Sequence, residues 1–250
     1  MGNRVKNVSA SIFSLMLLSL SLLAQDSSFN PIIENLQSGR PVIGTFTRTP
    51  SAELDFAIID VQYGDFDIEE VRAAIAGMLR GNKSPLVAPI VRTPLAARDN
   101  PQNIAEQLLD AGAHGLMFPD VETKAQAMAA MTSMATDKGD VWTSDSNGTL
   151  VAMIQIESPR GIANLDEILE VPGIGVLFLG PTDMATAIGA EGPDAAAVEV
   201  MVQEVLAVCL ARDIACGYPI LATSAVDAER QTAQRLAEGF KVLAVMTRAR

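Results

Sequence analysis

The stretch from Val151 to Met184 constrains the fold of this chain more than any other. It contains two apolar runs rich in β-forming residues, VAMIQIE at 151–157 and GVLFLG at 175–180, with a helical run at 161–170 between them. A strand–helix–strand unit of this kind makes its two strands parallel, because the helix returns the chain to the starting edge of the sheet. The chain therefore contains at least one α/β crossover.

A carboxylate follows each of these two strands. Glu157 ends the first, and Asp183 comes after the second and the turn at 180–182. Adjacent parallel strands lie about 4.8 Å apart, so both carboxylates can reach one ion at the carboxyl end of the sheet, where α/β folds place their sites. Each acid could instead cap the helix that follows it, because Asp is a common N-cap residue. The spacing predicts either a shared metal ion or two helix caps.

The rest of the chain repeats the alternation of strands and helices. Further strands are predicted at 41–46, 56–60, 86–92, 115–119, 214–219 and 240–246, and helices at 30–39, 68–80, 103–111, 123–135, 195–211 and 226–238. Eight strands with interleaved helices in 250 residues predict a single α/β domain, a (β/α)8 TIM barrel.

Two helices of an ideal barrel are predicted to be reduced or missing. Only residues 47–55 separate the first two strands, fewer than the roughly dozen that a crossover helix needs. No helical run follows the last strand at 240–246. The barrel would then expose apolar flanks that a partner subunit or the N-terminal helix could cover. We therefore expect a homo-oligomer.

The first 24 residues have the pattern of a secretory signal peptide. Arg4 and Lys6 precede an apolar run at 12–23, and the small Ala24 precedes the polar QDSS. The run is too short for a comfortable membrane span. Leu22, three residues before the cleavage point, is larger than ideal, so an uncleaved anchor is the alternative. Residues 25–250 are therefore expected to form the barrel domain of an exported protein, periplasmic or secreted, with no stable membrane insertion once the signal is removed.

The charge and the cysteines constrain partners and redox chemistry. The net charge of −12 argues against nucleic acid and anionic membranes as partners. Only Cys209, in a predicted helix, and Cys216, at the start of a predicted strand, are present. Export would permit a disulfide between them. Sequence alone cannot supply its geometry, and two buried free thiols are the interpretation that we favour.

Four stretches together resemble the HpcH/HpaI aldolase family, the metal-dependent class II pyruvate aldolases related to citrate lyase β subunits. They are PIVRTP, EQLLDAGAHGLMFPDVET, IQIESPRGIANLDEI and GVLFLGPTDMATAIG, and the resemblance runs from about Gly39 to Met246. It implies a (β/α)8 barrel. It also implies a carbon–carbon lyase that reversibly cleaves a 2-oxo-4-hydroxy acid to pyruvate and an aldehyde.

The resemblance also implies roles for individual residues. Glu157 and Asp183 would bind a divalent metal ion, Mg, Mn or Co, and a small 2-oxo acid such as pyruvate would be the partner. Arg92 would hold its carbonyl and the developing enolate. The backbone at Gly180, Pro181 and Thr182 would receive its carboxylate. Mg-type ions accept one or two carboxylates and leave positions for substrate, and a Lewis acid beside a cation suits enolate chemistry. Arg92 could alternatively be a salt-bridged or solvated residue at a strand end.

The second strand departs from the family pattern. It ends Asp60-Val61-Gln62-Tyr63, where the family has Asp-x-Glu-His, so Tyr63 stands at the position of the proton-transferring His. An unperturbed Tyr has a pKa of about 10 and makes a poor base at neutral pH. The family's His pairs with an Asp that Asp110 matches, so Tyr63 could hydrogen-bond to Asp110 instead. The sole His, His114, precedes the fourth strand and is excluded as the base.

This departure leaves other functions open. One is metal-assisted decarboxylation or enolisation of a small oxo acid, which asks less of a base. Another is a non-catalytic extracytoplasmic protein that binds a metal–oxo-acid complex. A third is a structural subunit of an assembly.

Overall fold

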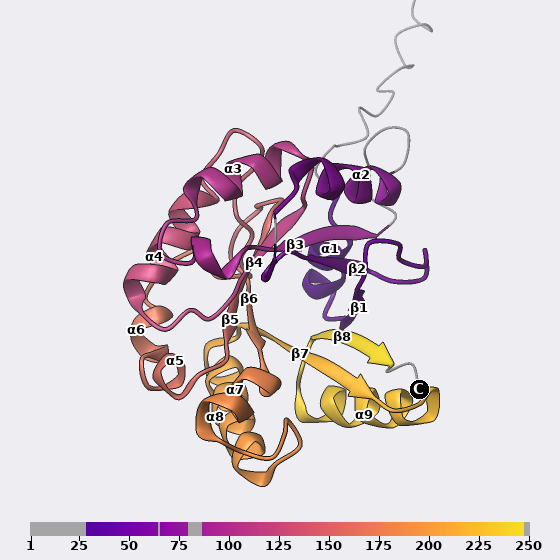
Figure 1. The fold of residues 1–250 in the computed structure, drawn as a ribbon, viewed down its shortest axis with the longest axis vertical. Coiled ribbons are helices and arrows are strands. Elements are labelled where there is room, and N and C mark those ends of the chain that lie inside the picture. The colour runs from indigo at the N-terminus through magenta and orange to yellow at the C-terminus, as the bar shows by residue number, and fades with distance from the viewer. Residues whose placement is uncertain (1–28, 65, 80–86, 248–250) are drawn as a thin grey trace, which may run out of the picture.

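Eight parallel strands close into a barrel in the computed structural model, which describes residues 29–64, 66–79 and 87–247 (Figure 1). Each strand pairs with its neighbour in sequence, and β8 pairs with β1. The predicted barrel is confirmed. The strands are β1 Val42–Phe46, β2 Phe56–Asp60, β3 Ala88–Arg92, β4 Gly115–Phe118, β5 Val151–Ile156, β6 Val176–Leu179, β7 Ala215–Ala222 and β8 Val242–Thr247.

Helices follow most strands and, except for α1, which precedes β1, pack outside the barrel. They are α1 Pro31–Gln37, α2 Ile68–Met78, α3 Gln102–Asp110, α4 Lys124–Ser133, α5 Pro159–Ala163, α6 Leu165–Ile168, α7 Pro181–Ile188, α8 Ala196–Arg212 and α9 Ala225–Glu238. The single helix predicted at 161–170 is instead the short pair α5 and α6. The break falls at Asn164, which has non-helical backbone angles and donates its side-chain amide to the carbonyl of Glu122.

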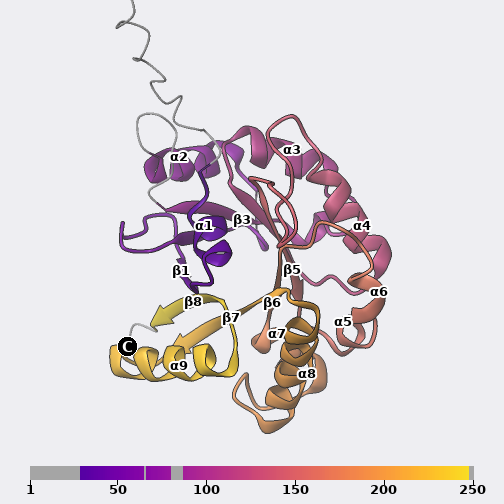
Figure 2. The ribbon, with the colours of Figure 1, turned by 180° about the vertical axis from the view of Figure 1, so that it is seen from behind.

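The first barrel helix is missing, as predicted, because residues 47–55 between β1 and β2 contain no helix. Figures 1 and 2 show the ring of outer helices interrupted between α2 and α9, on the side where β1 runs. Ile43 on β1 and Val245 on β8 are only partly buried. Helix α1 does not cover this flank, because its Ile32 and Ile33 pack into the barrel interior.

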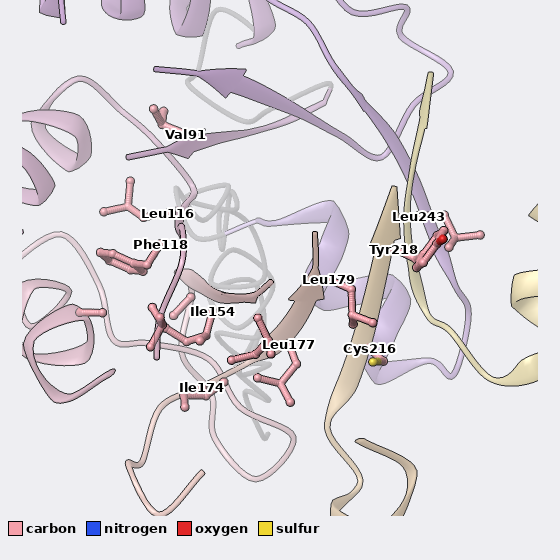
Figure 3. Close-up of a cluster of buried hydrophobic side chains, with 14 of the residues drawn as sticks. Val91, Leu116, Phe118, Ile154, Ile174, Leu177, Leu179, Cys216, Tyr218 and Leu243 are labelled. Atoms are coloured by element: carbon pink, nitrogen blue, oxygen red, sulfur yellow. The ribbon is translucent and has the colours of Figure 1, made fainter. Parts of the chain in front are cut away.

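Side chains alternate between two apolar cores. The inner core fills the barrel with Phe56, Met117, Met153, Phe178 and their neighbours. The outer core lies between strands and helices, and Figure 3 shows part of it, including Val91, Leu116, Ile154 and Leu177. Successive strand residues point to opposite faces. The same alternation that packs the two cores therefore fixes which polar residues face inward at the strand ends.

The two cysteines are paired, so the prediction of two free thiols was wrong. A disulfide joins Cys209 in α8 to Cys216 in β7, with Cα atoms 5.8 Å apart. The left-handed conformation of Asp213, φ 54°, reverses the chain between them, and the backbone N–H of Ile214 donates to the carbonyl of Cys209. Sequence alone could not reveal this tight helix-to-strand turn.

Removing the disulfide should lower the free energy of unfolding. A loop of seven residues predicts a loss of about 2 kcal/mol, chiefly through the unfolded state. We expect Cys209→Ala with Cys216→Ala to show this loss in urea unfolding without reductant. Reductant should destabilise the wild type by a similar amount and leave the double variant unchanged. A wild type that reductant does not affect would contradict the prediction.

None of the described helices is long and apolar enough to cross a membrane. The predicted signal peptide, residues 1–24, lies outside the described residues and stays a prediction.

Candidate active site

The carboxyl ends of the strands surround a pocket of about 360 Å³. The inward-facing residues of β2 and β3 continue to Asp60 and Arg92, which are register partners on neighbouring strands. Six of the predicted residues line the pocket: Tyr63, Arg92, Gly180, Pro181, Thr182 and Asp183. Phe46, Asp60, Gln62, Gln155, Phe178, Pro219, Leu221 and Met246 complete its wall.

Glu157 lies buried beside this pocket, with only 3% of its surface exposed. On β5, Val151 and Met153 face the barrel interior, and the alternation carries Glu157 to the same side. A side chain at Gly180 would collide with the carboxylate of Glu157, so the glycine makes room for it. Its Oε2 atom has no hydrogen-bond partner among the described residues. Such a buried acceptor is costly unless a ligand satisfies it.

The electrostatics of Glu157 favour a bound cation. Burial and, to a smaller extent, the nearby charge of Asp183 together raise the pKa of its carboxyl to about 8. Arg92 and the backbone of Asp120 lower it without reversing the shift. Two acidic groups therefore interact here with little compensating charge. Among the described residues no three potential ligands gather, but Mg-type ions accept two carboxylates and take water or substrate for the rest.

The alternative of two helix caps is excluded. Ser158, not Glu157, caps α5, and its hydroxyl accepts a hydrogen bond from the N–H of Gly161. Gly180 occupies the N-cap position of α7, so Asp183 is the third residue of the helix and lies within its first turn, and no side chain caps this helix. Neither acid is held by a capping role. Both carboxylates fit the residues expected to hold a divalent metal ion.

The raised pKa of Glu157 predicts a pH-dependent stability of the metal-free protein. The folded state holds this proton more tightly than the unfolded state, where the carboxyl has its ordinary pKa of 4.5. The contribution is fully present below pH 4.5 and is lost as the pH rises through about 8. The loss should be on the order of 4 kcal/mol. Urea unfolding with a chelator, from pH 4.5 to 9, measures it.

Glu157→Gln is the matched control for this measurement, because it removes the titrating group and keeps the shape. The variant should lose less stability with rising pH than the wild type. Identical pH profiles for both proteins would contradict the assignment.

Asp60 holds Arg92 in the pocket. The guanidinium donates from Nε and Nη2 to the two carboxylate oxygens, at 2.9 and 2.5 Å, and lies 4.8 Å from the ring centre of Phe46. Burial alone would raise the pKa of Asp60, but the hydrogen bond and charge of Arg92 outweigh it and the pKa is lowered. Arg92 is therefore both salt-bridged and in the pocket. Sequence reasoning missed Asp60 as its partner, although the matching strand ends could have indicated it.

Tyr63 stands at the pocket entrance with 68% of its surface exposed. Its hydroxyl accepts a hydrogen bond from the side-chain amide of Gln62 at 3.1 Å. Burial of the hydroxyl and the charges of Asp183 and Glu157 raise its pKa above the ordinary value of 10. The hydroxyl therefore keeps its proton at neutral pH and is unsuited to act as a base.

The predicted hydrogen bond between Tyr63 and Asp110 is not formed within the chain. Asp110 ends α3, which runs from the carboxyl end of β3 back to the amino end of β4. There Asp110 pairs with Lys138 at 3.0 Å. His114 lies at this same amino end, immediately before β4, and burial lowers its pKa to about 4. This position agrees with its exclusion as the base.

Two further polar residues belong to the site. Asp120 follows β4 in a left-handed conformation, φ 50°, and pairs with Arg98. Burial raises its pKa, with contributions from the charges of Glu122 and Asp183. Gln155 lines the pocket with an unpaired, buried amide oxygen. Its spacing two residues before Glu157 could have indicated it, because alternate strand residues share a face.

Comparisons with known proteins find a matching family model and several relatives. A protein-family model described as HpcH/HpaI aldolase/citrate lyase matches residues 46–246. The chain is 30% identical over 175 residues to a hydroxypyruvate/pyruvate aldolase of Rhizorhabdus wittichii, covering 60% of this chain and 66% of that protein. It is 31% identical over 200 residues to a 5-keto-4-deoxy-D-glucarate aldolase of Citrobacter koseri, covering 72% and 73%.

The fold of a solved structure is similar too. An HpcH/HpaI aldolase/citrate lyase family protein from Burkholderia cenocepacia superposes with a TM-score of 0.69 and 22% identity, covering 88% of this chain and 93% of that one.

Proposed function

Because the chain belongs to the HpcH/HpaI aldolase/citrate lyase family, we propose that it is a metal-dependent carbon–carbon lyase that reversibly cleaves a 2-oxo-4-hydroxy acid to pyruvate and an aldehyde. The observation that carries the proposal is the buried carboxylate of Glu157, whose Oε2 has no partner among the described residues, near Asp183 and beside the pocket that Arg92 lines. Relatives named as pyruvate and keto-deoxy sugar acid aldolases support the reaction class.

Glu157 and Asp183 would hold a divalent ion, Mg, Mn or Co. When bound, such an ion supplies Lewis-acid polarisation of a carbonyl oxygen. The carboxylates themselves fix its place at the end of β5 and the start of α7.

Arg92 would offset the negative charge that develops on the oxo acid as it becomes an enolate. Asp60 occupies Nε and Nη2, so the guanidinium is fixed in orientation and Nη1 remains for substrate. The carboxylate of the oxo acid would lie against the first turn of α7, at Gly180, Pro181 and Thr182, where the helix N-terminus favours an anion. Pro181 has no N–H and the N–H of Gly180 donates to the carbonyl of Ile156, so the backbone donor of this segment would be Thr182. These residues bind and orient the substrate.

Tyr63 would bind rather than transfer a proton, because its raised pKa keeps the hydroxyl neutral. This substitution favours a second candidate, a protein that binds a metal–oxo-acid complex without turnover. Proton exchange separates the two. We expect the C3 protons of pyruvate to exchange with D2O, followed by NMR, only in the presence of divalent metal. Pyruvate binding with no exchange and no aldol cleavage would favour the binding protein.

We also propose that the protein forms a homo-oligomer. The flank beside β1, with the half-buried Ile43 and Val245, is the surface that another copy would cover. Light scattering at micromolar concentration should report more than one chain per particle, and Ile43→Asp should lower the measured mass. A wild type that is monomeric under these conditions would contradict this.

Export remains part of the proposal. The Cys209–Cys216 disulfide is compatible with an oxidising compartment, where such bonds persist.

A further inference from the structure

A second pocket, of about 390 Å³, lies at the amino end of the barrel. Lys241, which lines it, immediately precedes β8, and Ala215 begins β7. Leu36 and Arg40 come from α1 and the segment after it. The candidate active site is at the opposite, carboxyl end of the strands. This second pocket is therefore separate from the residues that we propose hold metal and oxo acid.

The pocket has an apolar wall. Leu36, Trp142, Leu210 and Ile214 all line it. Leu210 is 58% exposed, although it is a large apolar residue. Trp142 is 4% exposed, and its indole N–H has no acceptor among the described residues. A volume of this size is within the range of small-molecule sites, which are mostly apolar with a few placed polar groups.

The pocket also gathers two cations without acidic partners. In the part of the chain that the structure describes, Arg40 and Lys241 are the Arg and Lys side chains with no Asp or Glu oxygen within 4.0 Å. They are about two hundred positions apart in sequence, yet both line this pocket. Asp213 lines it too, so the charged residues of the pocket wall have a net charge of +1. In a chain of net charge −12, that is a local reversal of sign.

We propose that this pocket binds an organic carboxylate with an apolar body. Arg40 and Lys241 pair with the carboxylate, and the wall formed by Leu36, Trp142 and Ile214 buries the body. The acidic surface repels anions elsewhere, so the site depends on these two cations acting at short range. The inference is independent of the proposed lyase activity, because no residue is shared between the two pockets.

The fluorescence of Trp142 tests this directly, because it is the only tryptophan of the chain and lines the pocket. Titrating the full chain with hexanoate should change its emission saturably, with matching heats in calorimetry. Hexanamide, which has the same body without the charge, should bind at least about tenfold more weakly, as expected for loss of a charge-assisted contact. Pyruvate with Mn²⁺ should not compete.

Arg40→Gln and Lys241→Gln should each weaken hexanoate binding about tenfold or more. Both side chains are exposed, so folding should be unaffected. Lys124→Gln and Arg230→Gln remove exposed cations elsewhere and should leave binding unchanged.

Three outcomes would overturn the proposal. One is no emission change and no heat with hexanoate. Another is equal affinity in the two pocket variants and the two controls. The third is binding that appears only when the protein is diluted to monomers, which would mean that a second copy occupies the pocket.

Discussion

Asp183→Asn is expected to weaken Mn²⁺ binding by roughly 100-fold or more, a larger effect than changing a residue that merely orients a ligand. The substitution leaves Glu157 as the single carboxylate at the site. An Asn oxygen is neutral and cannot replace the charge that a divalent ion requires. Glu157→Gln should have the same effect for the same reason. Isothermal titration calorimetry at neutral pH measures both, with the wild type as reference.

The control for this experiment is Asp166→Asn, an exposed acid whose partner is Arg212 at the outer surface. It should bind Mn²⁺ as the wild type does. Because Glu157 is buried and its Oε2 has no partner among the described residues, Glu157→Gln should also fold well without metal, so lost binding would not reflect unfolding. If either site variant binds Mn²⁺ as tightly as the wild type, the metal assignment is wrong.

The residues that face inward at the carboxyl ends of the strands could be predicted, because side chains along a strand alternate between its two faces. Once VAMIQIE is taken as a buried parallel strand, every second residue faces inward, and Glu157 must stand at the carboxyl end of the barrel. Arg92 follows from β3 by the same rule. The structure places both there and adds Asp60, the register partner of Arg92. That pairing depends on strand register, which a single strand's sequence does not specify.

Features that depend on tertiary contacts could not be predicted. The Cys209–Cys216 disulfide requires a left-handed residue at Asp213, a conformation that is uncommon for non-glycine residues. The break between α5 and α6 depends on the hydrogen bond from Asn164 to Glu122, whose carbonyl lies 42 residues away in sequence. Local periodicity contains no information about such partners.

Asp110 lies far from Tyr63 because of the direction in which α3 runs. The family resemblance suggested a partner for Tyr63, but α3 runs antiparallel to the strands and carries its last residue to the amino end. In this chain the Tyr63 hydroxyl instead accepts a hydrogen bond from Gln62, the residue before it in sequence. The two substitutions at the end of the second strand therefore interact with each other rather than with a distant acid.

Tyr63→His is expected to raise the rate of aldol cleavage by about 10²-fold, the lower end of the range for general acid–base catalysis. A His at this position would titrate near neutral pH, whereas the Tyr63 hydroxyl has a raised pKa and keeps its proton. The gain should stay at the lower end because Asp110 pairs with Lys138 and does not orient the new side chain. The measurement is cleavage and formation of an aldol from pyruvate and a simple aldehyde at saturating metal.

Tyr63→Phe is the matched control, because it removes only the hydroxyl that Gln62 contacts. If Tyr63 merely fills the space of a base, this variant should exchange pyruvate protons at nearly the wild-type rate. A large loss in Tyr63→Phe would show instead that the hydroxyl takes part in the reaction. A wild type as fast as Tyr63→His would mean that another group of the pocket moves the proton. If the wild type and Tyr63→His both bind pyruvate with metal and neither catalyses a reaction, the lyase proposal fails and the binding function replaces it.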